Sequence, residues 1–404
     1  LPDAAQMTYL GLFALQHRGQ EGCGIVCSDS QAEQPFSNHK SFGLVADSFD
    51  ESTLAKLVGE FAIGHVRYST QGGKLLENVQ PFTFRTPQFG PIAIAHNGNL
   101  TNADQLRDEL EETGSIFRTT SDTEVFMHLI AKDKSPRLED RIKNAMDRVH
   151  GAYSLVLLTR DHIYGVRDPF GFRPLVLGRR QVEEDGSDCR YMLASETCAL
   201  DLLEMESVRD IEPGEVVKLG NGTIESLGVF KKSQTKAFCS FEPIYFARPD
   251  SRIFDEEIYN VRKGLGITLA KEAPAPDADV VIAIPDSGVP MAIGFAEQSG
   301  LPLEIGLVRN HYIGRTFIQP SQNIRDFGVK MKLNPVLSTL KGKSVVVVDD
   351  SVVRGTTCVK IVRMLRKAGA KSIHLRVGSP PITHSCFYGV DTPHREKLLA
   401  AQKT

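Results

Sequence analysis

Apolar residues follow one pattern in the first part of the chain and a different pattern in the second. Helical spacing predicts helices over residues 4–16, 102–113, 123–132 and 138–149. Short apolar runs bounded by turn residues predict strands at residues 61–69, 91–98, 153–158, 163–168, 175–180, 191–195 and 214–219. Strands with helices grouped between them favour a layered α/β sandwich.

After residue 244 strands and helices alternate. The pattern predicts a helix over residues 255–272, a strand over 280–284, a helix over 290–300 and a buried strand over 344–348. Val359, Val362, Leu365 and Ala368 then recur at helical spacing, and Gly369 follows as a stop signal. This alternation is typical of βαβ units and predicts a parallel sheet. The polar stretch at 231–236 suggests a boundary, which gives domains 1–235 and 236–404.

Composition narrows the class of protein without identifying a function. Hydrophobic residues make up 41% and charged residues 24% of 404 residues, the balance of an ordinary globular protein large enough for two or three domains. The net charge of −3 gives no argument for nucleic acid or an acidic membrane as partner. Seven scattered cysteines without a C-x-x-C pair argue against a disulfide scaffold and favour a reducing compartment.

The most informative loop follows the valine-rich strand at residues 344–348. Asp349 and Asp350 close that strand, and residues 351–357 (SVVRGTT) supply small, hydroxylated and basic groups before the helix. Such a loop lies outside the carboxyl end of its strand, where ligands bind in open α/β sheets. Helix N–H groups suit a phosphate, and the carboxylates suit ribose hydroxyls or Mg²⁺. Two acids alone end many strands that bind nothing, so the added SVVRGTT carries the argument.

The whole string resembles the phosphoribosyl-pyrophosphate (PRPP) loop of type I phosphoribosyltransferases. The resemblance implies that Asp349 and Asp350 bind the ribose diol and that the following residues wrap the 5′-phosphate. The loop residues implied in PRPP binding are Ser351, Arg354, Gly355, Thr356 and Thr357.

Each of two further segments of the second domain can be interpreted either as purely structural or as functional. Ser287 in the loop IPDSG is either the N-cap of the next helix or, by the same resemblance, a Mg²⁺ ligand together with Asp349 and Asp350. Residues 309–333 carry an excess of four positive charges, which is either a solvated basic loop or a lid over the PRPP polyanion. Arg315 and Lys332 are the lid residues that we expect to contact PRPP.

Three short motifs in the first domain are weak evidence for a function when taken singly and become informative together. They are residues 15–24 (LQHRGQEGCG), 64–73 (GHVRYSTQGG) and 95–100 (AHNGNL), with TSDTE following at 120–124. Together, over residues 5–235, they resemble the class II glutamine amidotransferases, N-terminal-nucleophile hydrolases with αββα layers. The resemblance implies that Arg67 binds the glutamine carboxylate and Asp122 its amino group, while the Asn97 side chain and the Gly98 N–H form the oxyanion hole.

The nucleophile of that family is an N-terminal cysteine whose own α-amino group acts as base. This sequence begins with Leu1, and Cys23 carries no free amine, so we expect Cys23 to be a buried core residue. The residues given therefore predict no glutamine hydrolysis. Either a first strand is missing from this sequence or the domain is inactive, and the intact glutamine-binding residues favour a missing strand.

The two domains together resemble the amidophosphoribosyltransferase family, nearly from end to end. The resemblance implies conversion of PRPP, glutamine and water to 5-phosphoribosylamine, glutamate and pyrophosphate, the first step of de novo purine synthesis. It also implies internal transfer of ammonia, inhibition by purine nucleotides and a homotetramer. Alternatives are a PRPP-binding regulator, an inactive scaffold and an ammonia-only transferase with an inactive glutaminase domain. A hexosephosphate aminotransferase would lack VVVVDDSVVRGTT.

Cys239 and Cys386 gain a role from the same resemblance. Taken alone, each is typical of a buried small residue. In the iron–sulfur branch of the family, cysteines at FCSFE and SCFYG ligate a [4Fe–4S] cluster, which wants four thiolates. The resemblance implies two more cysteines beyond Thr404, so this chain would hold a partial set. It also leaves cytoplasm and plastid stroma open as locations.

Overall fold

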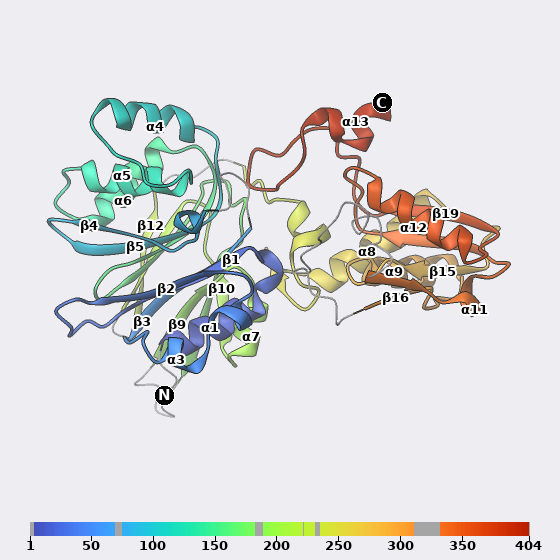
Figure 1. The fold of residues 1–404 in the computed structure, drawn as a ribbon, viewed down its shortest axis with the longest axis horizontal. Coiled ribbons are helices and arrows are strands. Elements are labelled where there is room, and N and C mark those ends of the chain that lie inside the picture. Colours follow the sequence, from blue (N-terminus) through green and yellow to red (C-terminus); the bar gives the residue numbers. More distant parts are fainter. Residues whose placement is uncertain are drawn as a thin grey trace. The chain divides into compact units, whose positions relative to one another are not determined.

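The computed structural model describes residues 4–68, 75–181, 189–220, 222–230, 235–310 and 332–403 (Figure 1). The chain forms two compact units. Unit 1 consists of Leu1–Cys239, Arg252–Asp255 and Cys386–Asp391, and unit 2 of Ser240–Ser251, Glu256–Ser385 and Thr392–Thr404. The boundary at residue 235/236 stays a prediction. None of the helices in the described ranges has both the length and the apolar character needed to cross a bilayer.

Three antiparallel sheets build unit 1. The largest has the order β12-β11-β7-β6-β5-β4, and the smaller two have the orders β2-β1-β3 and β10-β8-β9. Their strands are β1 (Gly22–Ser28), β2 (Phe36–Phe42), β3 (Phe61–Arg67), β4 (Phe82–Thr86), β5 (Gly90–Leu100), β6 (Gly151–Leu158), β7 (Ile163–Arg167), β8 (Val176–Gln181), β9 (Cys189–Ala194), β10 (Glu206–Asp210), β11 (Glu215–Gly220) and β12 (Thr223–Val229). The two-residue strand β13 (Arg252–Ile253) also belongs to unit 1 but to none of these three sheets.

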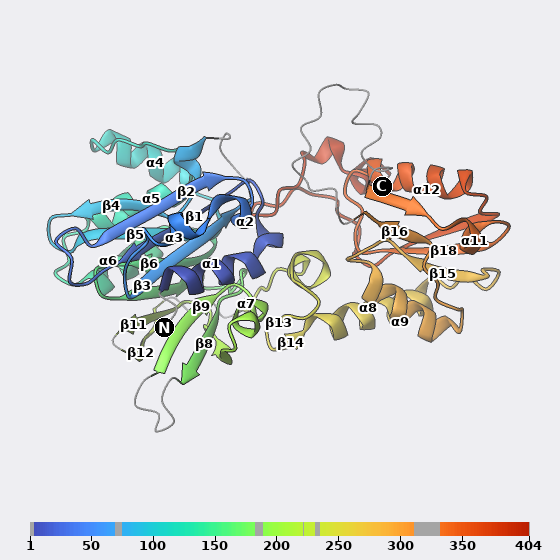
Figure 2. The same ribbon diagram turned by 60° about the horizontal axis from the view of Figure 1, so that its bottom comes forward.

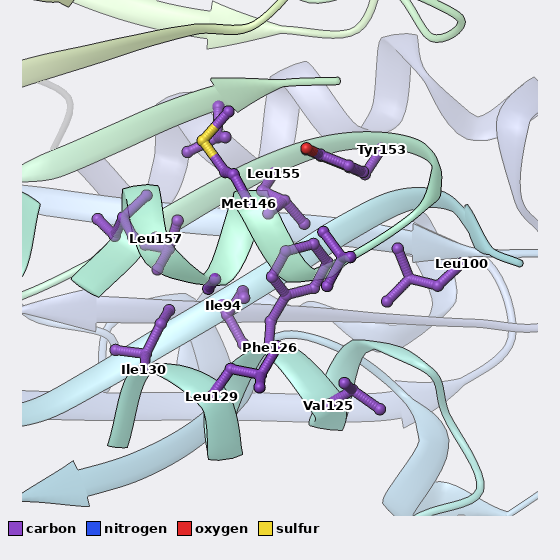
Figure 3. Close-up of a cluster of buried hydrophobic side chains, with 14 of the residues drawn as sticks. Ile94, Leu100, Val125, Phe126, Leu129, Ile130, Met146, Tyr153, Leu155 and Leu157 are labelled. Atoms are coloured by element: carbon purple, nitrogen blue, oxygen red, sulfur yellow. The ribbon is translucent and has the colours of Figure 1, made fainter. Parts of the chain in front are cut away.

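Helices cover both outer faces of these sheets, which gives the predicted αββα order. One face of the six-stranded sheet packs against α4 (Ala103–Glu112), α5 (Thr123–Lys132) and α6 (Leu138–Arg148). Phe126 of α5 lies at the centre of that core, against Tyr153 of β6 (Figure 3). The other face packs against the two smaller sheets. Beyond them lie α1 (Ala4–Ala14) and α7 (Thr197–Leu202), while α2 (Val45–Ser48), α3 (Glu51–Leu54), η1 (Gln16–Arg18) and η2 (Leu76–Asn78) are short.

Unit 2 contains the predicted parallel sheet, in the order β15-β18-β19. Helices α8 and α9 pack on one face and α12 on the other, because successive strand side chains alternate between the faces (Figure 2). The elements are η3 (Glu242–Phe246), β14 (Glu256–Glu257), α8 (Ile258–Glu272), β15 (Val280–Ala283), α9 (Val289–Ser299), β16 (Leu307–Arg309), β17 (Leu333–Pro335), α11 (Leu337–Leu340), β18 (Ser344–Asp349), α12 (Thr356–Lys367), β19 (Ser372–Val377), η4 (Arg395–Lys397) and α13 (Leu399–Lys403).

One helix begins later than its pattern predicts. The helix expected from residue 255 begins at Ile258, and Glu256–Glu257 form a short strand instead. Phe254 and Asp255 have φ values of 56° and 63°, which a right-handed helix cannot contain. Apolar spacing does not report this turn of the backbone, so the prediction of the first helical residue was wrong.

Candidate active sites

The first site lies at the carboxyl edge of the parallel sheet in unit 2. β15 and β18 are neighbouring parallel strands, so the loops that follow them meet at the same edge. The Ser287 hydroxyl donates a hydrogen bond to one carboxylate oxygen of Asp350, and the Ser351 hydroxyl donates to the other at 2.5 Å. The N-cap interpretation of Ser287 is wrong, because Gly288 is the cap residue of α9 and no side chain caps that helix.

The two acids of this site are neighbours in a poorly solvated place. Burial, and then the charge of Asp350, raise the pKa of Asp349 to about 7. Burial also raises the pKa of Asp350, although hydrogen bonds from Ser287 and Ser351 and the charge of Arg262 oppose the rise. Two adjacent carboxylates that resist ionisation gain stability from a cation or from donor hydroxyls. Such an environment suits hydroxyl donors or a divalent cation.

Arg262 is a functional neighbour that the sequence did not reveal. Its guanidinium is 1% exposed on α8 and donates to the Pro243 carbonyl at 2.7 Å and to the Ala247 carbonyl at 2.7 Å. It thereby places a positive charge behind Asp350. An arginine in an amphipathic helix ordinarily faces solvent, so only the packing shows this position.

The phosphate end of the same loop is open to solvent. Gly355 has a φ of 75° and precedes α12, whose first residues are Thr356 and Thr357. Arg354, Thr356 and Thr357 are exposed. The N–H groups of the first helical turn have no partner within the helix, which suits a phosphate.

Only the ends of the predicted lid lie in the described ranges. β16 and β17 pair antiparallel, and the Asn310 N–H donates to the Lys332 carbonyl at 2.9 Å, so the two ends of the lid segment are held together. Lys332 is exposed. Arg309 pairs with Asp286 in the Ser287 loop. Arg315 lies outside the described residues.

The second site lies on β5 in unit 1. His-Asn-Gly is part of this strand and not a turn. The Asn97 side-chain nitrogen, Nδ2, is buried and has no hydrogen-bond partner in the described part of the chain. Gly98 has a φ of 150°, and a Cβ there would lie 2.0 Å from the Ala152 carbonyl oxygen. The strand therefore presents a desolvated amide beside a backbone that only glycine can adopt.

Asp122 and Arg67 supply the charges around this strand. The Asp122 carboxylate accepts the Leu100 N–H at 2.8 Å and lies 3.7 Å from His96 Nδ1. Burial alone would raise the pKa of Asp122, but His96 and the Leu100 and Thr123 N–H groups outweigh it and lower the pKa. Arg67 ends β3, is 5% exposed and donates to the Leu75 carbonyl at 3.2 Å. An ionised acid and a buried cation suit the two ends of an amino acid.

A buried glutamine that the sequence did not single out supports the same strand. Gln80 Oε1 accepts the His96 N–H at 2.7 Å, and Gln80 Nε2 donates to the Thr123 hydroxyl oxygen at 3.3 Å. That hydroxyl oxygen lies 3.1 Å from His96 Nδ1. Gln80 therefore links the residue before Asn97 to the residue after Asp122. Its motif, NVQPF, gives no hint of a buried amide.

A cavity of about 740 Å³ extends from this site between two strand edges. Residues 61–65 of β3 and 189–194 of β9 line it, together with α1, His96 and Asn97. β3 and β9 each end their sheet in the described part of the chain, and α1, β3 and β9 lie next to one another in Figures 1 and 2. Cys23 does not line this cavity and is fully buried, as predicted.

Cys239 and Cys386 both belong to unit 1 and lie near the same aromatic pair. The Cys239 N–H donates to the Phe172 carbonyl at 3.3 Å, and the Phe172 ring stacks on Tyr388 at 4.4 Å. The Tyr388 N–H approaches Cys386 Sγ at 3.3 Å. Both cysteines are partly exposed. Within the described ranges, no group of three or more His, Cys, Asp or Glu side chains is arranged to hold a metal ion.

Comparison with known proteins defines the class of each site. A glutamine amidotransferase domain family matches residues 65–201, and a phosphoribosyl transferase domain family matches residues 271–377. The chain is thus a glutamine amidotransferase joined to a phosphoribosyltransferase.

Relatives that span both domains identify the family. The chain is 54% identical to amidophosphoribosyltransferase 1, chloroplastic, of Arabidopsis thaliana over 99% of its own length and 69% of the relative's. It is 48% identical to amidophosphoribosyltransferase of Bacillus subtilis, over 99% and 81% of the two lengths. A solved structure of glutamine PRPP amidotransferase from B. subtilis, complexed with ADP and GMP, superposes with a TM-score of 0.89 at 47% identity and covers 99% of this chain and 84% of that one.

The chain belongs to the amidophosphoribosyltransferase family, whose reaction is the first step of de novo purine biosynthesis. It therefore has the αββα glutaminase fold and the parallel-sheet phosphoribosyltransferase fold that its motifs predict.

Proposed function

We propose that this protein couples glutamine hydrolysis in unit 1 to PRPP amination in unit 2, with each residue in the role that its motif predicts. One observation carries the glutaminase half: the buried amide of Asn97 has no partner in the described residues. A buried donor without a partner costs roughly 1–3 kcal/mol. An oxyanion that forms during hydrolysis would satisfy this donor at the moment of reaction.

The other glutaminase roles follow from charge and position. Arg67 binds the glutamine α-carboxylate and Asp122 its α-ammonium group, because the first is a buried cation and the second has a lowered pKa. The Gly98 N–H is the second oxyanion donor. Gln80 and His96 hold the backbone of this strand in place.

In unit 2 the two loops after β15 and β18 bind the PRPP sugar and phosphates. Asp349 and Asp350 accept hydrogen bonds from the ribose hydroxyls, and the α12 start with Arg354 binds the 5′-phosphate. Arg315 and Lys332 of the lid contact the pyrophosphate that leaves. The 5′-phosphate residues include Ser351, Gly355, Thr356 and Thr357.

Mg²⁺ fits the oxygen donors at the edge of this sheet. Ser287, Asp349 and Asp350 would hold it, since the Ser287 hydroxyl already lies against Asp350 and the pKa of Asp349 is raised. When bound, the ion neutralises charge on the departing pyrophosphate. We expect chelation to abolish PRPP turnover and added Mg²⁺ to restore it, and turnover that persists in excess chelator would rule the assignment out.

Cys239 and Cys386 would supply two of the four thiolates that a [4Fe–4S] cluster needs. Both thiols are partly exposed beside one aromatic pair, so they could share a cluster with two further thiolates from outside the described residues. Iron and sulfide analysis of the full-length protein tests this assignment. About four of each per chain would support it, and their absence would overturn it.

We further propose that the nucleophile is the thiol of an N-terminal cysteine on a strand that fills the cavity beside β3 and β9. Such a strand would pair with both free edges and join two small sheets, and Asn97 lines the same cavity. In the full-length protein, alkylation should abolish glutamine-dependent turnover and spare ammonia-dependent turnover. Peptide mapping should find the label on the N-terminal cysteine and not on buried Cys23; loss of both turnovers together would contradict the assignment.

Release of pyrophosphate from PRPP, measured with glutamine and separately with ammonia, tests the coupled function. Activity with both nitrogen sources supports it. Activity with ammonia alone would indicate a transferase with an inactive glutaminase domain. Activity with neither would favour the alternative, a PRPP-binding regulator.

Regulation, assembly and location are further proposals, and the names of relatives support the first and the last. A solved relative binds ADP and GMP, so we expect purine nucleotides to inhibit PRPP turnover here as well. We propose a homotetramer, which light scattering would test. Plant relatives are named as chloroplastic, which supports a plastid or cytoplasmic location that cell fractionation can decide.

A further inference from the structure

Six residues from late in the sequence belong to unit 1, although residues on both sides of them belong to unit 2. These are Cys386–Asp391, which we call the 386–391 segment. The glutaminase fold is otherwise complete long before this point in the sequence. A short insertion of this kind needs a physical reason, and its contacts supply one.

The segment binds the strand that carries the proposed oxyanion hole. Asn99 Nδ2 donates to the Phe387 carbonyl at 2.9 Å. Asn99 lies two residues after Asn97 on β5, so the two side chains point to the same face of the strand, roughly 7 Å apart. Asn99 is 7% exposed, so solvent has little access to this hydrogen bond.

The next residues of the segment contact the backbone of Gly98 itself. Gly389 has a φ of 97°, and a Cβ on it would lie 2.9 Å from the Gly98 carbonyl carbon and 3.0 Å from the Gly98 oxygen. The segment therefore lies directly against the peptide group that follows Gly98. Residue 389 must be glycine for this approach to occur.

A separate set of contacts fixes the segment in place. Arg173 is 3% exposed and donates to the Tyr388 carbonyl at 2.9 Å. The Tyr388 ring stacks on Phe172, with ring centroids 4.4 Å apart and an angle of 19° between planes. Two consecutive carbonyls, of Phe387 and Tyr388, are thus bound by buried side chains of unit 1. The segment is held by its backbone and is not simply lying on a surface.

We propose that the 386–391 segment is a positioning element for the oxyanion hole, which acts through Asn99 and Gly98 and does not itself touch glutamine. Oxyanion donors must point at a site about 3 Å away, and a displacement of about 1 Å can cost roughly a hundredfold in rate. The segment restrains the peptide group that follows Gly98, whose N–H is one proposed donor. It also restrains the side chain of Asn99, two residues after Asn97, whose amide is the other proposed donor. This inference rests on the proposed glutaminase roles of Asn97 and Gly98.

Gly389→Ala in the full-length protein tests the proposal. The new methyl group presses on the Gly98 peptide, so kcat with glutamine should fall about 10- to 100-fold, while KM for glutamine changes little. Turnover with ammonia should stay within about twofold, because ammonia bypasses the oxyanion hole. Asn99→Asp, which replaces the donor to the Phe387 carbonyl by an acceptor, should give the same split.

Gly114→Ala is the matched control. Gly114 is also in unit 1 with a positive φ of 86°, but a Cβ there meets nothing within 4 Å. This variant should leave both turnovers unchanged. A purely structural role would lower glutamine and ammonia turnover of Gly389→Ala and Asn99→Asp in parallel, and that result would overturn the proposal.

Unchanged kcat with glutamine in Gly389→Ala and Asn99→Asp would overturn it equally. A parent protein without glutamine turnover would defeat the proposed glutaminase function, and this inference with it. That outcome is distinguishable, since it is seen before any variant is made.

Discussion

Asn97 is the residue at which local stability and proposed function oppose each other most plainly. Its amide nitrogen is buried without a partner in the described residues, and natural proteins avoid such groups. Gly98 beside it has a φ of 150° against a neighbouring carbonyl. Both features weaken the fold slightly, and both leave donors available to a reacting oxygen.

Replacement of Asn97 by Ala should therefore affect the reaction more than the fold. Loss of one oxyanion donor typically costs about 10²- to 10³-fold in kcat, so glutamine turnover should fall by that factor. Ammonia turnover should be unchanged, and the unfolding temperature should not fall, since the Asn97 amide nitrogen makes no hydrogen bond within the described residues. Steady-state kinetics with both nitrogen sources and a thermal melt measure this; a large drop in melting temperature would contradict the account.

His65 gives unit 1 a pH dependence of stability. Its Nε2 lies 3.1 Å from the His96 carbonyl, and burial, followed by the charge of His96, lowers its pKa to about 4 from 6.5. Below pH 6.5 the His65 side chain is protonated in the unfolded chain but stays neutral in the folded unit. The folded state therefore loses stability as the pH falls from 6.5 towards about 4. The difference between the two pKa values of His65 corresponds to roughly 3 kcal/mol of unfolding free energy.

Urea unfolding of the protein and of His65→Gln across this pH range measures the effect. The glutamine keeps a donor for the His96 carbonyl but does not titrate. The stability of the variant should therefore change less between about pH 4 and pH 6.5 than that of the parent. Parallel curves for the two proteins would show that His65 does not contribute.

Among the elements, α8 and α9 position the edge of the sheet that bears the PRPP loops. They cross where their backbones nearly touch: a Cβ on Gly266 of α8 would lie 1.9 Å from the Met291 carbonyl oxygen of α9. The close crossing allows α8 to reach the sheet and to place buried Arg262 behind Asp350.

Gly266→Ala should destabilise unit 2, because the methyl group has no space at the crossing. Overpacking of this kind costs about 1–3 kcal/mol, and PRPP binding should weaken with it. Gly264→Ala is the matched control in the same helix, since a Cβ there meets nothing within 4 Å. It should stabilise α8 by up to about 1 kcal/mol. Denaturant unfolding compares the two, and equal stability would contradict the packing argument.

The sequence predicts elements best where the periodicity is unbroken. Thr123–Lys132 begins and ends where its spacing indicates, and the strand before Asp349 is buried as its valines suggest. Prediction failed at residues 254–255, where positive φ values delay a helix without any change in hydrophobicity.

Some residues of the candidate sites can be predicted from local sequence, and others are revealed only by the packing. Asn97, Ser287 and Asp350 stand in short motifs, so local sequence names them. Gln80 and Arg262 act through burial and through bonds to residues far along the chain, which a reading of local pattern cannot detect. The contact of Asn99 with Phe387 spans 288 positions and likewise has no local signal.

At the scale of the whole molecule, the two units should respond asymmetrically to damage. Asp350→Asn leaves Ser287 and Ser351 without the carboxylate to which both donate, and it removes a proposed diol and Mg²⁺ contact. Every reaction that consumes PRPP should fall, with glutamine and with ammonia alike, by about 10²-fold or more. Changes at Asn97 should affect glutamine turnover alone.

Glutamate release in the absence of PRPP completes the comparison. Glutamate release should persist in Asp350→Asn and fall about 10²- to 10³-fold in Asn97→Ala, if each unit carries its own chemistry. The three measurements (turnover with glutamine, turnover with ammonia and glutamate release without PRPP), made on both variants, distinguish a coupled enzyme from a single active unit with a passive neighbour. Equal loss of ammonia turnover in both variants would contradict the division of labour.

The path of the chain has a practical consequence for anyone who wishes to divide this protein. The backbone passes between units at 239/240, 251/252, 255/256, 385/386 and 391/392, so no single cut separates them. A gene fragment that stops at residue 239 would omit the partners of Phe172, Arg173 and Asn99. Isolated glutaminase halves should therefore be cloned with a linker that restores residues 386–391, as a split-protein designer would do.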